Sequence, residues 1–365
     1  MTTKSMPTSP IQPMLARIAE VLPAEPGFRF EPKWDGFRAL VFRAREGLVL
    51  QSRDLKPLNR YFPELERALL EALPPGCVLD GEIVVATPNG LDFEALQLRL
   101  HPAASRVAKL SVETPASFVA FDLLALDGHA TMALSQAERR ALLERLLAGA
   151  MPPLHLTPAT RDRDEAARWL QEFEGAGLDG VVAKLESATY QPGRRAMLKI
   201  KHARSADCVV AGFRWYRDRM DAVGSLLLGL YDDDGVLQHV GVTSSFTMAR
   251  RVELLCELAP LRRNAAATHP WRAATAAGAG PVGQSRWSRG RVPGWEPLRP
   301  ERVCEVRYDH LQGRRFRHAT TFLRWRPDKP ATDCRYDQLE VTTPFELARV
   351  FGAQSSTGAR RDLSA

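Results

Sequence analysis

The sequence predicts an α+β protein in which a larger N-terminal part is followed by a small β-barrel. Strand and helix patterns over residues 1–204 are mixed without a strict strand-helix-strand alternation, which argues against a doubly wound parallel sheet. After about residue 205 the chain changes to strand candidates separated by turns, with little helix signal, as in small barrels. The 365 residues are 45% hydrophobic, enough to build the cores of two medium-sized domains.

Charge and cysteine content restrict the class of protein further. Lys and Arg number 50 against 43 Asp and Glu, and the net charge of +7 permits a polyanionic partner without requiring one. No stretch reaches the roughly 18 consecutive apolar residues of a membrane helix, and the N-terminal segment lacks the apolar region of a secretory signal. The five cysteines form no CxxC pair, which argues against disulfide frameworks and zinc ribbons. We therefore expect a soluble, reduced, cytoplasmic protein that acts as a monomer and has no membrane partner.

Alternating hydrophobic patterns locate the strands of the N-terminal domain, which we expect to span residues 1–204. Residues 28–54 are interpreted as a hairpin with its turn at Glu46-Gly47. Further strand patterns are bounded by turn residues and cover residues 77–86, 117–128, 178–186 and 196–202.

Three helices are predicted among these strands. Leucines recur on one helical face within residues 60–73. Ser135 and Glu138 form a capping box ahead of a second helix that ends near Gly149. Residues 162–174 have the pattern of a third helix, and the glycines that follow them stop it.

The barrel domain is expected to span residues 205–350. Its one helix is predicted at 248–258, and residues 264–300, rich in Ala, Gly, Pro, Arg and Trp, are expected to form an irregular excursion. The last residues, 351–365, are small and polar and are predicted to be disordered. The strand candidates of this domain cover residues 208–217, 224–242, 302–311 and 321–327.

Basic and aromatic residues are interleaved between Arg286 and Arg326. This segment contains 11 Arg against four acids, and its aromatic residues are Trp287, Trp295, Tyr308, Phe316 and Trp325. On a small barrel this mixture is typical of a nucleic-acid surface. A solvated rim of arginines around buried aromatic side chains explains the same composition, and the sequence alone does not decide between the two.

Charged clusters stand at the ends of several apolar strands. They contain Lys33, Asp80-Gly81-Glu82, Asp179, Lys199 and Lys201. Residues two apart in a strand share a face, so Lys199 and Lys201 are expected to point the same way. Two lysines on a half-buried sheet are costly unless an anion lies beside them. Lysines facing a cleft, with acids on neighbouring strands, therefore indicate a site for a phosphate and a divalent metal.

These clusters resemble the ordered motifs of the covalent nucleotidyltransferases, which include DNA ligases, RNA ligases and capping enzymes. Stretches outside the motifs, such as the junction at residues 203–213, are similar to the short bacterial ATP-dependent DNA ligases of the C type. The seven matching elements, from motif I to motif VI, are Lys33-Trp34-Asp35-Gly36 with Arg38, Ser52-Arg53, Asp80-Gly81-Glu82, Phe121-Asp122, Asp179 to Lys184, Leu198 to Lys201, and Leu323 to Lys329.

The resemblance implies a fold and an activity. The fold is a nucleotidyltransferase (adenylation) domain of mainly antiparallel sheets with flanking helices, followed by an OB-fold. The activity is the sealing of nicks in double-stranded DNA through a lysyl-AMP intermediate and a DNA-adenylate, with ATP and Mg²⁺ or Mn²⁺ as cofactors. The resemblance also implies a role in DNA repair or end-joining, and partners such as Ku.

The same resemblance assigns the catalytic residues. Lys33 attacks the α-phosphate of ATP. Lys199 and Lys201 are the cations that disfavour the charged form of Lys33 and hold the phosphate. Glu82 and Asp179 are placed nearest the metal and the ribose. Many members of the family have Glu at the position of Asp179, and this carboxylate, shorter by one methylene, leaves open a direct bond to the metal or a contact through water.

The nucleotide-binding residues are also assigned by the resemblance. Phe121 stacks on adenine, and Glu31 with the adjacent backbone at Pro32 reads the amino edge of that base. Arg38 contacts nucleotide or nick phosphate, and Arg53 contacts the 5′-phosphate of the nick. Lys184 is assigned to the site, and the alternative is that it is a surface lysine. For Phe121 the alternative to stacking is a position in the hydrophobic core. Motif VI closes over ATP and orients pyrophosphate through Arg324, Arg326, Asp328 and Lys329, and its pattern does not tell which arginine faces inward.

Two alternatives to a DNA ligase remain open from the sequence. A capping-type guanylyltransferase or an RNA ligase shares motif I and the lysyl-nucleotide. A catalytically inactive module that only binds nucleic acid is the second alternative, although the intact Lys33, Glu82, Lys199 and Lys201 argue against it.

Overall fold

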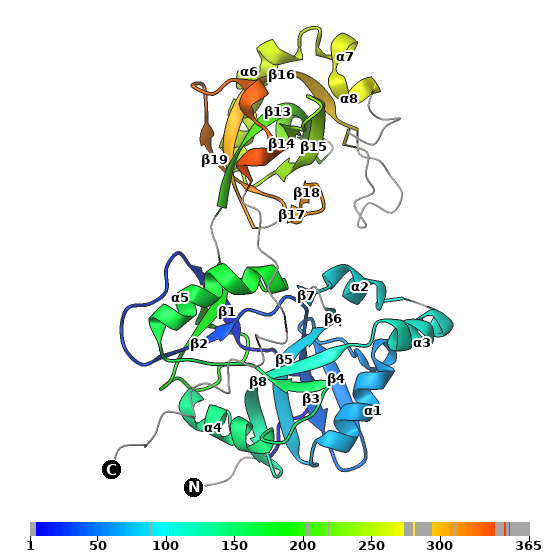
Figure 1. The fold of residues 1–365 in the computed structure, drawn as a ribbon, viewed down its shortest axis with the longest axis vertical. Coiled ribbons are helices and arrows are strands. Elements are labelled where there is room, and N and C mark those ends of the chain that lie inside the picture. The colour runs from blue at the N-terminus through cyan, green and yellow to red at the C-terminus, as the bar shows by residue number, and fades with distance from the viewer. Residues whose placement is uncertain are drawn as a thin grey trace. The chain divides into compact units, whose positions relative to one another are not determined.

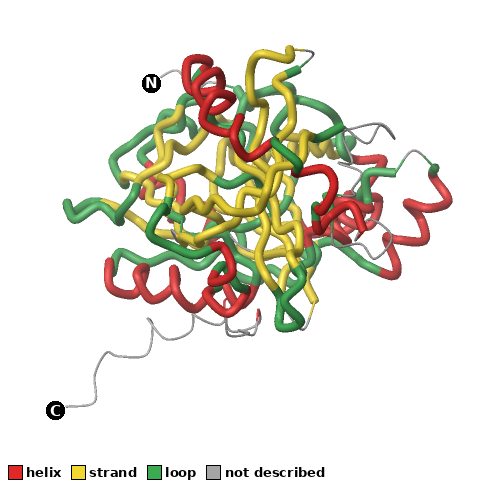
Figure 2. The backbone as a smooth tube through the Cα atoms, turned by 90° about the horizontal axis from the view of Figure 1, so that it is seen from above, coloured by secondary structure: helices red, strands yellow, loops and turns green. Residues whose placement is uncertain are grey.

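A computed structural model shows two compact units (Figure 1). The first unit comprises Met1–His202 with Thr342–Ala365, and the second comprises Ala203–Val341. Figure 2 distinguishes the helices, strands and loops of the chain by colour. No helix among the described residues is long and apolar enough to cross a membrane. The residues that the structure describes are 5–87, 90–101, 103–201, 204–217, 219–273, 280–281, 294–309, 311–339, 347 and 350.

The larger sheet of the first unit confirms most of the predicted strands. Its main strands follow the order β10-β8-β5-β3-β4, and they pair antiparallel except for β10 and β8. The predicted turn at Glu46-Gly47 joins β3 to β4, where Ala44 N–H donates to the carbonyl of Gly47. The strands are β3 (Phe37–Arg43), β4 (Leu48–Ser52), β5 (Cys77–Val84), β8 (Ser117–Leu126), β9 (His129–Ala130), which pairs with β8, and β10 (Leu154–Leu156).

A second, four-stranded sheet corrects the interpretation of residues 28–54 as one hairpin. Residues 28–32 form β2, which pairs with β11 rather than with β3. The chain then crosses to the larger sheet through Gly36, where a Cβ would lie 2.2 Å from the carbonyl oxygen of Ile83. Only glycine fits such a close approach. The strand order is β1 (Leu15–Ala19), β12 (Arg195–Ile200), β11 (Val181–Leu185) and β2 (Phe28–Pro32).

The predicted helices cover these sheets. The capping box is present as expected, with Ser135 accepting from Glu138 N–H and Glu138 accepting from Ser135 N–H. Leu65 and Leu69 are fully buried in the core between the first helix and the larger sheet. The helices of this unit are α1 (Pro63–Ala72), α2 (Phe93–Leu98), α3 (Ala104–Glu113), α4 (Gln136–Leu146) and α5 (Arg163–Glu172), and a short ladder pairs β6 (Ala86–Thr87) with β7 (Gly90–Leu91).

The second unit is a closed five-stranded barrel, as expected for an OB-fold. Its strands follow the order β15-β14-β13-β16-β19. The two edges meet where Thr320 N–H donates to the carbonyl of Val242 (2.8 Å) and the Thr243 hydroxyl donates to the carbonyl of Thr320 (2.9 Å). The elements are β13 (Arg204–Tyr216), β14 (Arg219–Tyr231), β15 (Leu237–Thr243), α6 (Met248–Arg262), β16 (Glu296–Tyr308) and β19 (Thr321–Trp325), with α7 (Ala265–Thr268), α8 (Pro270–Ala273), β17 (Leu311–Gln312) and β18 (Arg315–Phe316).

Two expectations for the C-terminal half need correction. The described part of 264–300 is not wholly irregular, since it contains α7, α8 and the start of β16, and Trp271 is fully buried. Residues 342–350 were assigned to the barrel, but Leu347 and Val350 pack in a core cluster of the first unit with Trp34. The predicted disordered tail, 351–365, lies outside the described residues.

Candidate active site

Lys33 lies where the chain leaves β2. Its N–H donates to the carbonyl of Gly180 (2.8 Å), and its carbonyl accepts from Asp179 N–H (2.9 Å). Its Nζ lies 2.5 Å from Oδ2 of Asp179, which also contacts Nζ of Lys201 at 3.1 Å. Burial would raise the pKa of Asp179, but the two ammonium groups outweigh it and lower that pKa to about 2. Asp179 is therefore an anion that holds both lysines.

Strand β12 brings further cations to the same place. Arg195, Met197 and Lys199 alternate along the strand, and all three line one cavity. Burial, the neighbouring Lys33 and Lys201, and then Arg195 lower the pKa of Lys199. This row of cations is suited to an anionic ligand such as a phosphate.

Glu82 and Arg38 lie opposite each other on β5 and β3. Burial raises the pKa of Glu82 to about 7, against the opposing effects of Arg38 and Lys33. Arg38 lines the cavity, but its guanidinium donates to both carboxylate oxygens of Asp80 at 2.6 and 2.7 Å. Tyr190 O–H donates to the same carboxylate at 2.7 Å. The guanidinium of Arg38, which is expected to contact phosphate, is thus already paired with Asp80.

Phe121 of β8 lies between two cations. Its ring centroid is 4.5 Å from Cζ of Arg38 and 4.9 Å from Nζ of Lys184. Lys184 is buried, so its interpretation as a surface lysine is wrong. Its Nζ donates to the carbonyl of Phe121 (2.8 Å) and lies 2.7 Å from Oε2 of Glu31. Phe121 is 9% exposed and lines the cavity.

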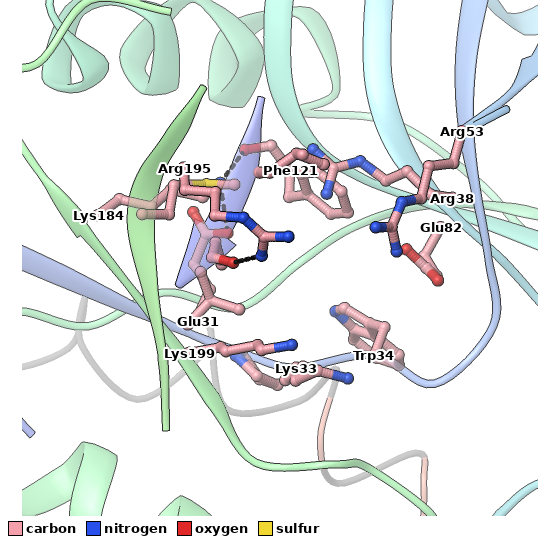
Figure 3. A pocket seen from close by; sticks show the side chains of 15 residues that line it. Glu31, Lys33, Trp34, Arg38, Arg53, Glu82, Phe121, Lys184, Arg195 and Lys199 are labelled. Carbon is pink, nitrogen blue, oxygen red and sulfur yellow. Dashed lines mark hydrogen bonds and ion pairs between the residues drawn. The ribbon is translucent and has the colours of Figure 1, made fainter. Parts of the chain in front are cut away.

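A cavity of about 190 Å³ brings most of the predicted residues together (Figure 3). In that view Lys33 and Lys199 lie on one side of the cavity and Phe121 on the opposite side. Asp179 and Lys201 do not line it and instead contact Lys33 or each other from behind. The predicted residues that line the cavity are Glu31, Pro32, Lys33, Arg38, Arg53, Glu82, Phe121, Lys184 and Lys199.

Sequence reasoning missed two large side chains of this cavity. Arg195 lines it and donates to the carbonyl of Ala16 at 3.3 Å. Its position four residues before Lys199 on the same strand is a period-2 signal that could have revealed it. Trp34 also lines the cavity, and its indole N–H donates to the hydroxyl of Thr157 (2.8 Å). Nothing in the local sequence indicates a partner 123 residues away.

The motif VI residues lie on and after β19 of the second unit. Arg326 donates to both carboxylate oxygens of Asp207 at 3.0 and 2.9 Å, and Lys329 Nζ lies 3.3 Å from the same carboxylate. Asp328 also pairs with Arg326, at 2.8 Å. Arg324 pairs with Glu305 across the strands, and its side chain is 63% exposed. Of the two arginines, Arg324 is therefore the more accessible and Arg326 the more firmly held.

Two aromatic residues of the basic segment are buried, and two others, Trp295 and Trp325, are half-buried. Tyr308 and Phe316 are 3% and 7% exposed, and their ring centroids lie 4.7 Å apart in the barrel core. The indole N–H of Trp325 donates to Glu257 (2.9 Å), and the guanidinium of Arg302 covers its ring at 3.9 Å. Trp287 lies outside the described residues. For the described part of the segment, the structure favours a rim of arginines around buried rings over an aromatic stacking surface.

Of the two predicted metal ligands, Glu82 lines the cavity, where a divalent metal could be shared with a phosphate, whereas Asp179 is paired with Lys33 and Lys201. No group of three His, Cys, Asp or Glu side chains in the described part of the chain could hold a metal by itself. Mg²⁺ is commonly bound by one or two carboxylates together with substrate phosphates and water. Glu82 lines the cavity as an acidic oxygen donor, and Asp179 lies behind Lys33. These two residues are therefore the candidates for such a partial site.

Comparisons with known proteins agree with this geometry. Residues 13–201 match the family "ATP dependent DNA ligase domain", and residues 219–329 match "ATP dependent DNA ligase C terminal region". DNA ligase C2 of Mycolicibacterium smegmatis is 55% identical over 91% of this chain and 94% of its own length. DNA ligase C of Mycobacterium tuberculosis is 52% identical over 93% of this chain and 97% of its own length.

A solved structure supports the fold alone. A structure reported for Lig E DNA ligases is similar with a TM-score of 0.52 and 18% identity, and covers 86% of this chain and 99% of that chain. The family match over residues 13–201 by itself covers more than half of the 365 residues. With relatives above 50% identity over nearly their whole length, the chain belongs to the ATP-dependent DNA ligases, and within them to the short bacterial enzymes of the C type.

Proposed function

We propose that this enzyme seals nicks in double-stranded DNA and that Lys33 carries the AMP group between ATP and the DNA. The observation that carries the proposal is the position of the Lys33 amine beside a cavity that Lys199, Glu82 and Phe121 also line. A nucleophile, a cation for phosphate, a carboxylate for metal and an aromatic ring for a base are the parts that nucleotidyl transfer requires.

In the first step the ammonium of Lys33 loses a proton to solvent, the neutral amine attacks the α-phosphate of ATP, and the nitrogen releases a second proton to water as the phosphoramidate forms. A bond forms between Nζ and phosphorus while the bond from phosphorus to the pyrophosphate oxygen breaks. The ion pair of 2.5 Å with Asp179 holds the amine in place beforehand. Because the pKa of Asp179 is about 2, this carboxylate is a poor proton acceptor, and its role is to position the amine.

The cations around Lys33 serve the phosphate. Lys199 and Arg195 project from one strand into the cavity, where they offset the charge that develops on the α-phosphate. The neighbouring cations also lower the pKa of Lys199, so the site as a whole disfavours additional positive charge. Glu82 and Asp179 would hold the divalent metal, which supplies further neutralisation of the phosphate charge.

The adenosine end of ATP is assigned to the opposite side of the cavity. Phe121 offers the exposed part of its ring for stacking, and Glu31 with Pro32 lies next to it. Motif VI of the second unit supplies cations for pyrophosphate, and the accessible Arg324 is the first candidate for direct contact. Arg326 and Lys329 are then arranged by Asp207 and Asp328.

In the later steps AMP passes to the 5′-phosphate of the nick, and the 3′-hydroxyl displaces AMP. Arg53 lines the cavity and has an exposed side chain, as a contact to the 5′-phosphate requires. Proteins named as multifunctional non-homologous end joining LigD are 35% identical over 258 residues. This similarity supports a role in repair or end-joining, in which a DNA-end-binding protein such as Ku is the partner.

Mass spectrometry after incubation with ATP and magnesium tests the proposal. We expect AMP on the peptide that contains Lys33, release of AMP on addition of nicked duplex, and no adduct in Lys33→Ala. A matched control is Lys109→Ala, because Lys109 is exposed on α3 and pairs with Glu113. An unmodified Lys33 in enzyme that seals nicks would overturn the assignment, and an adduct formed only with GTP would favour a capping-type enzyme.

A further inference from the structure

Glu31 lies between two buried cations that come from different elements. Its Oε2 is 2.7 Å from Nζ of Lys184 on β11, and its Oε1 is 3.6 Å from Nη1 of Arg140 on α4. All three side chains are 3% exposed. Glu31 and Lys184 line the active-site cavity, whereas Arg140 lies behind them and does not.

The hydrogen bonds of this cluster leave one acceptor unused. Oε1 of Glu31 and Nη1 of Arg140 are buried, and neither has a hydrogen-bond partner among the described residues. The other nitrogens of Arg140 are anchored, because Nε donates to Glu144 (2.7 Å) and Nη2 donates to the carbonyl of Thr157 (2.8 Å). Arg140 is thus fixed with Nη1 toward Oε1 of Glu31.

Glu31 is the carboxylate that both buried cations of the cluster contact. Buried cations are strongly destabilising unless an anion lies beside them. Lys184 has Glu31 as its anionic contact in the cluster, and Arg140 contacts both Glu31 and the half-exposed Glu144. An ionised carboxylate accepts hydrogen bonds and cannot donate them, whereas a protonated one can donate.

We propose that Arg140, together with Lys184, sets the choice of purine by keeping Glu31 a pure hydrogen-bond acceptor. Such an acceptor pairs with an amino group at the 6-position of a purine and rejects a carbonyl oxygen there. A site built to bind one polar group discriminates strongly against an analogue that leaves its groups unpaired. The inference rests on the proposed role of Glu31 in contacting the base, and it adds a positioning residue that lies on a helix outside the sequence motifs.

Arg140 is the better residue for a test. Lys184 also donates to the carbonyl of Phe121 and lies against its ring, so its loss would disturb stacking as well. Arg140 does not line the cavity, and its contact with a cavity-lining carboxylate is the one with Glu31. Replacing Arg140 should therefore change the preference between nucleotides more than it changes the rate of reaction with ATP.

The experiment compares ATP with ITP, which carries a carbonyl at the 6-position. The rate of AMP or IMP transfer to full-length enzyme gives kcat/KM for each nucleotide and hence their ratio. We expect Arg140→Gln to lower the ATP-to-ITP ratio about tenfold, and Arg140→Lys to retain most of it. Arg140→Met is a second neutral variant in case Arg140→Gln does not fold, and it should lower the ratio to a similar extent.

The controls separate this inference from the assignment on which it rests. Arg29 lies on β2 two residues before Glu31 and pairs with Glu186. Arg29→Gln removes this cation and should leave the ATP-to-ITP ratio unchanged. Glu31→Gln introduces an amide that can also donate a hydrogen bond, so the ATP-to-ITP ratio should fall further than in the Arg140 variants. An unchanged ratio in Glu31→Gln would show that Glu31 does not read the base. A ratio lowered by Glu31→Gln but retained in Arg140→Gln and Arg140→Met would overturn the role of Arg140 alone.

Discussion

Asp179 shows how one side chain prepares the nucleophile. It is the anion shared by Lys33 and Lys201, and its pKa of about 2 keeps it charged at any pH at which the enzyme works. A neutral residue at this position would release both ammonium groups and remove a carboxylate proposed to help hold the metal. The charge of Asp179 should therefore matter more than its length.

Replacing Asp179 tests this view. We expect Asp179→Asn to slow formation of the AMP adduct by about 10²-fold or more, the size of effect seen when one electrostatic group is removed from an active site. Asp179→Glu keeps the charge with one more methylene and should stay within about tenfold of the natural enzyme. Single-turnover adduct formation at saturating ATP measures both, and equal rates in Asp179→Asn and the natural enzyme would refute the role.

The ion pair between Asp122 and Arg139 is predicted to be structural. Nε of Arg139 lies 2.7 Å from Oδ1 of Asp122, and the side chains are 0% and 3% exposed. Burial would raise the pKa of Asp122, but the ion pair and hydrogen bonds with Arg139 outweigh it and hold that pKa below its usual range. Asp122→Asn leaves a buried, unpaired guanidinium and should lower the free energy of unfolding by about 3–5 kcal/mol.

This stabilisation should depend on pH in one direction. The pKa of Asp122 is lower in the folded than in the unfolded chain, so the unfolded chain binds the proton more readily. The contribution is therefore complete above about pH 4, the pKa range of an unfolded Asp, and is lost as pH falls through the folded value. Urea unfolding should show a constant gap between the natural protein and Asp122→Asn at pH 6–8. The gap should narrow below pH 4, and a gap that widens there would contradict the assignment.

At the residue scale, the sequence predicted the side chains that carry local motifs. Lys33, Glu82 and Lys199 all border the cavity as expected. The partners that orient the site could not be predicted, because they are distant in the sequence. Tyr190, for example, donates to Asp80 across 110 residues, and no local pattern indicates that pairing.

At the scale of the element, strand alternation decides which residues face the core. On β16, Tyr308 is buried, whereas the adjacent Arg307 is exposed. The composition of residues 286–326 mixes basic and aromatic residues, but the described strands place them on opposite faces. Composition does not record which face a residue lies on. It could therefore not decide between a nucleic-acid surface and a rim of arginines around buried rings.

Paired substitutions on β16 should separate stability from DNA binding. Tyr308→Ala removes a buried ring and should lower the free energy of unfolding by about 3–5 kcal/mol. Arg307→Ala should leave the melting temperature unchanged, weaken binding to nicked duplex, and reduce the slope of log affinity against log salt by about one. Fluorescence anisotropy over a range of salt concentrations measures the slope, and a salt-independent affinity of the natural enzyme would exclude an arginine-rich phosphate surface.

The predicted elements differ from the structure mainly in length and pairing. The barrel strands β13, β14 and β16 each have 13 residues; β13 and β16 begin before the predicted segments 208–217 and 302–311, and the predicted segment 224–242 is divided between β14 and β15. The register shifts between Val210 and Gly212, where a Cβ would lie 2.7 Å from the ring of Trp295. Such bulges bend a long strand around a barrel. On β16 the same irregularity lies between Pro297 and Arg302, where the predicted strand 302–311 begins, which explains why residues 296–301 were not predicted as part of it.

At the scale of the whole molecule, the chain returns to its first unit after the barrel. Leu347 and Val350 are buried in a cluster with Trp34 and Trp169 of that unit. Composition placed the boundary between the two domains near residue 205, close to the division at residues 202 and 203. The return could not be predicted, because two apolar residues in a short C-terminal segment carry no sign of which core they join.

This return determines how the contribution of the second unit must be tested. Truncation after residue 204 removes motif VI together with Leu347 and Val350, so loss of activity could reflect a damaged core. Replacing residues 203–341 by a long flexible linker removes the barrel and retains both side chains. We expect this variant to melt at a higher temperature than the truncation but to form the AMP adduct at least about 10²-fold more slowly than the full chain, because the motif VI cations are lost. Adduct formation at the natural rate by the linker variant would show that the first unit reacts with ATP unaided and that Arg324 and its neighbours have no part in that step.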